Sequence, residues 1–352
     1  MAKKEVMQGN EALAESALRA GCRFFAGYPI TPQTEITEYL AAKMNDMPDR
    51  AFVQGESELA SINMVYGASG SGARAMTATA GQGLALMAEG MSQLADAQVP
   101  AVIVDVQRGG PGNGGTAPSQ GDYNFVTKSL GHGGFHAFVF GPSTVQETAD
   151  MVYEAFDIAD EYRCVVMIMT DGMLGHLIES VELKPYRDLK ALPPRPWTEK
   201  GNPEGRKLQI CGGQPDIELE KARRIEKIYE KWERELARVE HFMTDDAEVI
   251  LAAWGTVART AKTAIRKLRA EGHKIGLIRP ITIYPFPVAA FAELDEKRVR
   301  HLITMENATP AQFHLDVKAA LGGKPIPLST YHRGMGSELS VEEIEEQLRG
   351  LL

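Results

Sequence analysis

The chain has 352 residues, of which 44% are hydrophobic, and it carries a formal net charge of −9. This length predicts two domains, and the composition is typical of a soluble globular protein. The negative charge argues against nucleic acid as a partner, and no apolar stretch is long enough to span a membrane. Because the N-terminus lacks the apolar core of a signal peptide, we expect a cytoplasmic location.

The cysteines and histidines predict no metal site on this chain. Cys22, Cys164 and Cys211 are far apart and form no C-x-x-C pair, so neither a disulfide framework nor an iron–sulfur or structural zinc site is expected. None of the eight histidines pairs at metal-binding spacing with a third ligand.

Helix-period and strand-like segments alternate through residues 1–182. Strands are predicted at 22–27, 75–80, 101–106 and 164–171, and helices at 10–20, 33–46, 58–68, 84–95 and 144–160. Asn10 is the expected N-cap of the first helix. The nearly continuous apolar character of 101–106 and 164–169 favours a parallel sheet covered on both faces. We therefore expect one doubly wound α/β domain over 1–182.

The remainder of the chain predicts a linker and a second domain. Residues 183–244 begin with clustered prolines, which are typical of a linker, and continue into a long amphipathic helix at 216–240. That helix is expected to lie across the domains or against a neighbouring subunit. A smaller α/β domain is predicted over 245–352, with strands at 248–255, 274–280 and 301–307 and helices at 257–271, 309–320 and 340–350.

The run Tyr28-Pro29-Ile30-Thr31-Pro32 suits a helix start, with Thr31 as N-cap and Pro32 in the first helical position. A helix N-terminus also attracts carboxylates, so the Thr31 hydroxyl is a candidate substrate contact. Local sequence leaves both interpretations open.

Glu56 and Glu58 directly precede an apolar helix. Their charges suit a helix N-terminus. Alternatively, one carboxylate points into the crevice of the sheet and shares a proton with a ring nitrogen. Spacing alone does not decide between the two interpretations or between the two residues.

The glycine-rich run after Arg108, residues 109–115, follows the C-terminal end of a strand, where open α/β sheets bind ligands. It contains G-x-G-x-x-G, but no helix opens there and no acidic strand end follows, which argues against a dinucleotide site. The pattern fits a lid in which Arg108 binds a carboxylate, or else a surface loop without a role.

In chain order, several stretches together resemble the α-type, pyrimidine-binding subunit of the 2-oxoacid:ferredoxin oxidoreductases. The closest resemblance is to the branched-chain (2-oxoisovalerate) subfamily. It covers most of the chain and is weakest across 183–244. The stretches are 26–36 (AGYPITPQTEI), 55–61 (GESELAS), 72–87, 107–122, 141–147, 170–176 and 277–288.

The resemblance implies a thiamine-diphosphate-binding domain of the pyrimidine type, followed by a smaller transketolase-C-like domain. It implies that Glu58 bonds N1′ of the aminopyrimidine, with Glu56 the less favoured neighbour. It implies further that Tyr28 and Pro29 help to bind the cofactor, and that Thr31 and Arg108 contact the substrate carboxylate. The expected reaction is oxidative decarboxylation of a 2-oxoacid to acyl-CoA and CO₂, with electrons passing to ferredoxin.

The Gly-Asp-Gly motif that holds Mg²⁺ and the diphosphate is missing, and so are cluster cysteines. The resemblance therefore implies a β-type subunit that binds the diphosphate and Mg²⁺, a γ-type subunit, and a small ferredoxin-like iron–sulfur subunit. Ferredoxin and coenzyme A are the expected further partners.

Four alternatives stay open at this point. The chain could be a 2-oxoglutarate-specific homologue, or the β-type subunit of a lipoamide-dependent 2-oxoacid dehydrogenase. It could also be a scaffold that kept the fold but not the site, or a nucleotide-binding module based on the glycine-rich loops.

Overall fold

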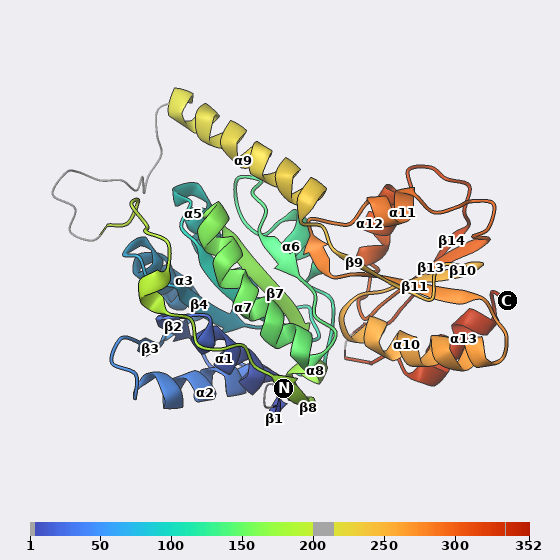
Figure 1. Ribbon diagram of the computed structural model, residues 1–352, viewed down its shortest axis with the longest axis horizontal. Helices are drawn as coiled ribbons and strands as arrows, with labels where there is room; N and C mark the ends of the chain where they lie inside the picture. The colour runs from blue at the N-terminus through green and yellow to red at the C-terminus, as the bar shows by residue number, and fades with distance from the viewer. Residues whose placement is uncertain (1–3, 200–214, 335) are drawn as a thin grey trace.

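The computed structural model describes residues 4–199, 215–334 and 336–352, which form a larger and a smaller α/β part (Figure 1). The larger part is built on a seven-stranded sheet with the order β12-β6-β7-β5-β4-β2-β3. Neighbouring strands are parallel except β12, which runs antiparallel to β6. The strands are β2 (Phe24–Gly27), β3 (Ala51–Gln54), β4 (Ala75–Thr79), β5 (Ala101–Gln107), β6 (Phe138–Phe140), β7 (Val165–Asp171) and β12 (Thr282–Tyr284).

Helices cover both faces of this sheet, which confirms the predicted doubly wound architecture (Figure 1). Alternate residues of β5 and β7 point to opposite faces, and all are buried. One face packs against α1 (Gly9–Arg19), α2 (Thr34–Met44) and α7 (Val145–Tyr162); the other packs against α3 (Glu58–Gly70), α4 (Gln82–Leu86), α5 (Ala88–Ala97) and α6 (Tyr123–Lys128).

The start of α1 differs from the prediction. Gln8 is the N-cap, and Asn10 lies inside the helix. The Asn10 amide donates 2.8 Å hydrogen bonds to the Pro32 carbonyl oxygen and to Glu35 Oε2. The N-cap prediction was wrong because the partners of Asn10 come from more than twenty residues away.

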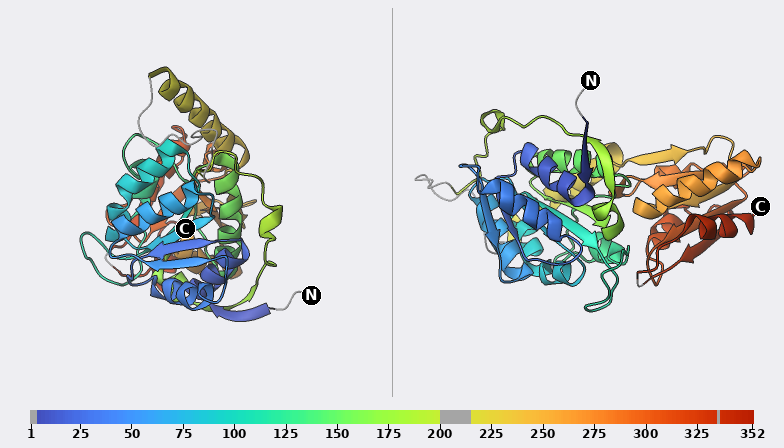
Figure 2. Two further views of the ribbon diagram at one scale, coloured as in Figure 1. Left: turned by 90° about the vertical axis from the view of Figure 1, so that its left-hand side faces the viewer. Right: turned by 90° about the horizontal axis from the view of Figure 1, so that it is seen from below.

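A two-stranded antiparallel ribbon, β1 (Lys4–Gln8) with β8 (Ile178–Glu182), projects beside the larger sheet (Figure 2). β8 follows the short helix α8 (Gly172–His176), and a single 3₁₀ turn, η1 (Leu189–Ala191), lies in the segment that follows β8.

The long helix α9 (Pro215–Glu235) crosses the larger part (Figure 1). Trp232 is completely buried, with its ring 5.4 Å from that of Phe138 and 5.6 Å from that of Tyr162. The helix ends five residues earlier than predicted, because Val239–Phe242 form the strand β9. Residues 200–214 of the predicted linker, with Cys211, lie outside the described residues.

The smaller part is a five-stranded sheet with the order β14-β13-β10-β11-β9, parallel except for β9. Its other strands are β10 (Val249–Ala252), β11 (Ile275–Pro280), β13 (His301–Glu306) and β14 (Leu328–His332). The helices are α10 (Gly255–Ala270), α11 (Ala289–Ala292), α12 (Phe313–Ala320) and α13 (Val341–Arg349).

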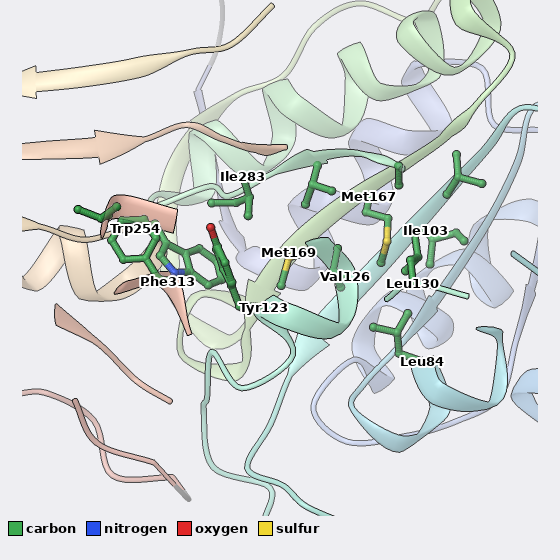
Figure 3. Packing of buried hydrophobic residues seen from close by; sticks show 14 of the residues in the cluster. Leu84, Ile103, Tyr123, Val126, Leu130, Met167, Met169, Trp254, Ile283 and Phe313 are labelled. Atoms are coloured by element: carbon green, nitrogen blue, oxygen red, sulfur yellow. The ribbon is translucent and has the colours of Figure 1, made fainter. Parts of the chain in front are cut away.

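The two parts share one hydrophobic core (Figure 3). The Tyr123 ring of the larger part lies 5.8 Å from the ring of Trp254 and 5.9 Å from that of Phe313. Buried Arg279 of β11 adds ion pairs to Glu147 of α7 and Glu240 of β9. These contacts fix the smaller part against one end of the larger sheet.

No helix among the described residues has both the length and the apolar character needed to cross a lipid bilayer.

Candidate functional site

The loops that carry the predicted site residues meet at one edge of the larger sheet. β2, β4, β5 and β7 are parallel, so their C-terminal ends lie together at what we call the carboxyl edge. Tyr28–Pro32 follows β2, Gly81–Gly83 follows β4, and Arg108 follows β5. Open α/β sheets bind ligands in this position.

Glu58 is the first residue of α3 and is only 4% exposed, whereas Glu56 is exposed. Ser57 caps the helix by accepting a 3.1 Å hydrogen bond from the Ala60 amide. Of the two glutamates, it is therefore Glu58 that turns its carboxylate into the protein.

The glycine at position 83 is required by the close approach of Glu58. A Cβ at this position would overlap Glu58 Oε1 and Thr79 Oγ1 and would lie 2.8 Å from Glu58 Cδ. Gly81, two residues earlier, has a φ of +46°, which favours glycine. The turn after β4 is thus built around the Glu58 carboxylate.

Arg108 and Thr31 are brought together. Arg108 donates from Nη1 to the Thr31 carbonyl oxygen and from Nη2 to the Asn113 carbonyl oxygen, both at 2.9 Å. The Nε of Arg108 is buried without a partner among the described residues. The guanidinium therefore lies at the carboxyl edge, next to the loop that follows β2.

The helix start predicted at Thr31 and Pro32 was wrong. α2 begins at Thr34 with Gln33 as its N-cap residue. Gln33 is buried because its side chain bonds the Tyr28 carbonyl oxygen at 2.9 Å and accepts a bond from Thr37 Oγ1. The loop thus closes on itself before the helix begins. Thr31 is exposed and its hydroxyl takes no part in capping.

Tyr28 and Pro29 are exposed on the same loop, and the Tyr28 side chain is 38% exposed. The structure places both residues at the carboxyl edge on the chain that leads to Thr31.

The glycine-rich loop, residues 109–117, is closed by hydrogen bonds between Gly109 N and Ala117 O (3.0 Å) and between Gly115 N and Gly109 O (2.9 Å). No helix opens from it, in agreement with the rejection of a dinucleotide site. Asn307 of the smaller part contacts the C-terminal end of this loop, where its Nδ2 atom donates a 3.1 Å hydrogen bond to the Pro118 carbonyl oxygen.

Two acidic residues at this edge were missed by the sequence analysis. Asp105 of β5 is completely buried, and burial together with the charge of Asp122 raises its pKa well above the usual range. Burial also raises the pKa of Asp122, the residue before α6, to about 6. One signal was available, because Asp105 is the single charge in the apolar strand AVIVDV.

Asp171, at the end of β7, links the two parts. It caps α8 by accepting from Leu174 N at 3.0 Å, and its other oxygen accepts from Thr256 Oγ1 of the smaller part. Burial raises the pKa of Asp171 to about 6. The hydrogen bonds from Thr256 and Leu174 favour the charged carboxylate and offset part of this increase.

Fold and site together define a doubly wound α/β protein with a candidate ligand site at the carboxyl edge. Residues 15–241 match the family described as "Pyruvate flavodoxin/ferredoxin oxidoreductase, thiamine diP-bdg", and residues 247–344 match "Pyruvate:ferredoxin oxidoreductase core domain II". The chain belongs to this family of 2-oxoacid:ferredoxin oxidoreductase subunits.

Individual relatives agree with this assignment. The chain is 40% identical to the ketoisovalerate oxidoreductase subunit VorB of Methanothermobacter thermautotrophicus, over 98% of this chain and 97% of the relative. It is 39% identical to the 2-oxoglutarate synthase subunit KorA of Methanocaldococcus jannaschii, over 84% and 87%.

A solved structure shows the same fold. The 2-oxoglutarate:ferredoxin oxidoreductase from Magnetococcus marinus, with 2-oxoglutarate, coenzyme A and succinyl-CoA bound, matches with a TM-score of 0.86 at 26% identity. The match covers 99% of this chain and 65% of that one. These findings confirm the predicted family, fold class and enzyme class, and they do not support the lipoamide-dependent alternative. The relatives are named as subunits, so the chain is one subunit of a larger enzyme.

The family binds thiamine diphosphate, and the residues present fit its aminopyrimidine half. The buried Glu58 carboxylate beside Gly83 suits a ring nitrogen that shares a proton. Within the described residues, no group of three or more histidine, cysteine, aspartate and glutamate side chains is arranged to hold a metal ion.

Proposed function

We propose that this chain is the pyrimidine-binding subunit of a thiamine-diphosphate-dependent enzyme acting on branched-chain 2-oxoacids such as 2-oxoisovalerate. The products are acyl-CoA and CO₂, and the electrons pass to ferredoxin. The observation that carries the proposal is the buried carboxylate of Glu58, packed against Gly83 at the carboxyl edge.

When bound, thiamine diphosphate supplies the nucleophilic carbon and the electron sink for decarboxylation. Glu58 holds a proton between its carboxylate and N1′ of the aminopyrimidine, and its burial keeps water from competing for that bond. Gly83 leaves room for the Glu58 carboxylate. Tyr28 and Pro29 contribute to the wall of the cofactor site.

Arg108 and Thr31 bind the carboxylate of the 2-oxoacid. The two bonds from Arg108 to backbone carbonyls fix the plane of its guanidinium, and each Nη keeps a second N–H for the substrate. The exposed hydroxyl of Thr31 adds a further donor.

The charges at the carboxyl edge favour a substrate with a single carboxylate. Among residues 28–32, 79–83, 107–122 and 170–176, Arg108 is the one arginine or lysine. The second carboxylate of 2-oxoglutarate would need another cation, whereas a branched aliphatic side chain needs none. The similarity to VorB supports the same choice.

The proposed partners follow from what this chain lacks. They are a β-type subunit that binds the diphosphate and Mg²⁺, a γ-type subunit, a small ferredoxin-like subunit with iron–sulfur clusters, ferredoxin and coenzyme A. Nucleic acid and membranes are not proposed as partners, and the proposed location is the cytoplasm.

The test is a pair of variants of the chain within the purified complex. Glu58→Gln keeps the shape of the side chain but not its charge, and should lower kcat about 100-fold or more. Glu56→Gln changes an exposed neighbour and should keep the parent rate. Full activity of Glu58→Gln would refute the role of Glu58 and favour a scaffold.

Substrate choice is tested on the parent complex by comparing kcat/KM for 2-oxoisovalerate, 2-oxoglutarate and pyruvate. We expect 2-oxoisovalerate to be preferred at least about tenfold, because an unpaired second carboxylate is costly to bury. A preference for 2-oxoglutarate would overturn the substrate assignment but leave the cofactor role intact.

A further inference from the structure

Two carboxyl groups without good partners lie under the turn that follows β4. Asp105 is 0% exposed, and neither of its oxygens has a hydrogen-bond partner among the described residues. The Oδ2 atom of Asp122 is likewise buried without a described partner. The Asp122 amide donates a 3.2 Å hydrogen bond to Gln107 Oε1, and Gln107 stands two residues beyond Asp105 on the same face of β5. This bond holds Asp122 beside Asp105, in agreement with the effect of its charge on Asp105.

Asp105 is connected to the proposed site through Thr79. The two residues are in register on the adjacent strands β4 and β5, so their side chains stand on the same face about 5 Å apart. The Thr79 hydroxyl has no described partner and lies, with Glu58 Oε1, around the position that a Cβ of residue 83 would occupy. The order across the site is therefore Asp122, Asp105, Thr79, Glu58.

Other charged groups around Asp105 do not neutralise it. Arg108, at the end of the same strand, is bonded to the carbonyl oxygens of Thr31 and Asn113. Asp171 at the end of β7 is another carboxyl group, bonded to Thr256, and supplies no positive charge to Asp105. The Gly81 amide points toward Asp105 but does not reach hydrogen-bond geometry, and its tendency to lower the pKa of Asp105 is outweighed by burial and by the charge of Asp122.

Two buried carboxyl groups at close range do not both ionise easily. Burying such a pair lowers the stability of the fold, whereas an apolar residue at the same position of the strand would carry no such penalty. Its position beside the Glu58 turn makes a functional role the better explanation.

We propose that Asp105 and Asp122 share one proton and act as positioning residues for Glu58. This proposal rests on the proposed function of Glu58. While the pair holds the proton, Asp105 is neutral and Glu58 carries out its role without a second negative charge beside it. When the shared proton leaves to solvent at alkaline pH, Asp105 becomes charged and activity falls. No bond forms between the pair and the cofactor.

The first test uses the full chain without cofactor. At pH 8 the infrared spectrum should contain a protonated-carboxyl band that Asp105→Asn removes. Because the pKa of Asp105 is raised on folding, the parent loses stability as pH rises from about 4. Asp105→Asn should therefore have a higher Tm than the parent at pH 8, by more than at pH 4.

Glu306→Gln is the matched control. Glu306 is also completely buried, but its carboxylate accepts from the amides of Gln312, Phe313 and His314. This variant should lower the Tm at both pH values. A spectrum in which the protonated-carboxyl band survives Asp105→Asn overturns the shared proton, whatever Glu58 does.

The second test is the pH dependence of kcat for the complex. Asp105→Asn should move the alkaline limb of the profile up by about one pH unit or more. Asp122→Asn should move the alkaline limb to lower pH, because Asp105 ionises at a lower pH once the neighbouring negative charge is removed. KM should stay within about twofold in both, because neither residue touches the substrate.

Opposite shifts support the proposal, and a uniform loss of kcat with an unchanged profile overturns it. Full activity of Glu58→Gln would instead refute the proposed function. In that case the infrared and unfolding results still decide whether the pair holds a proton.

Discussion

Arg108 donates a hydrogen bond from Nη1 to the backbone carbonyl oxygen of Thr31, 77 positions earlier in the chain, at 2.9 Å. A second bond, to the Asn113 carbonyl oxygen, ties the same guanidinium to the glycine-rich loop. The side chain thus joins the loop after β2 to the loop after β5, and it places a permanent positive charge where they meet.

Arg108→Lys should raise KM for the 2-oxoacid about 10- to 100-fold. Lysine keeps the charge but cannot make two bonds in one plane while also meeting a carboxylate. Steady-state kinetics of the complex with 2-oxoisovalerate provide the measurement. Arg300→Lys, at an exposed ion pair with Glu248, is the control and should leave KM as it is. An unchanged KM for Arg108→Lys would exclude Arg108 as the carboxylate-binding residue.

Gly83→Ala should lower affinity for thiamine diphosphate at least about tenfold, because the added Cβ displaces the Glu58 carboxylate. Titration of the complex with the cofactor is the measurement. Gly67→Ala is the matched control, at an exposed position of α3 where a Cβ meets nothing within 4 Å. That change should stabilise the chain by about 0.5–1 kcal/mol. Equal affinities in the two variants would contradict the proposed position of Glu58.

Thr256→Val should destabilise the chain more at pH 8 than at pH 5. The pKa of the Asp171 carboxyl is about 6 in the folded protein, above the roughly 3.9 expected unfolded. The stability it contributes is therefore present below about pH 4 and is lost as pH rises through 6. Without the Thr256 hydroxyl the folded pKa rises further, so the additional loss at pH 8 should be about 1–3 kcal/mol.

Denaturant unfolding of the full chain at both pH values measures this effect. Thr260→Val removes a hydroxyl that bonds the Thr256 carbonyl oxygen within α10, and serves as the control. A loss for Thr256→Val that does not depend on pH would show that Asp171 is not the group responsible.

Trp232→Ala should cost about 3–5 kcal/mol in the free energy of unfolding, because it removes the buried ring that holds α9 against the larger sheet. Urea denaturation gives the value. The exposed neighbour Glu233→Ala should change stability by less than about 0.5 kcal/mol. Similar small effects for both residues would mean that α9 is not anchored at Trp232.

The regular elements could be predicted because their signals are local. The apolar strands β5 and β7 were placed to within a residue, since uninterrupted apolar runs bounded by polar residues mark buried parallel strands. The parts that could not be predicted depend on distant partners. The Asn10 side-chain amide donates a hydrogen bond to the distant Pro32 carbonyl oxygen. The helix α9 ends early because the residues after it form β9, which pairs with β11.

The same distinction holds for the site. Glu58, Thr31 and Arg108 were named from motifs. Local spacing did not separate Glu58 from Glu56, but the family resemblance favoured Glu58, and the burial of Glu58 agrees with that choice. Asp122 lies near Asp105 because its amide bonds Gln107 of β5, fifteen residues earlier in the chain, and no local pattern describes that contact. The division into residues 1–182, 183–244 and 245–352 remains our proposed domain organisation.

The strands β9 and β12 connect the two sheets in a way that prevents the chain from being cut into two complete domains. β12 lies at the edge of the larger sheet although three strands of the smaller sheet, β9, β10 and β11, precede it in the chain. β9 lies before residue 245 and yet completes the smaller sheet. Any single cut between residues 243 and 281 would leave the first fragment without β12 and the second without β9. Neither fragment would then hold a complete set of strands, so we expect heating to melt both sheets in one cooperative transition.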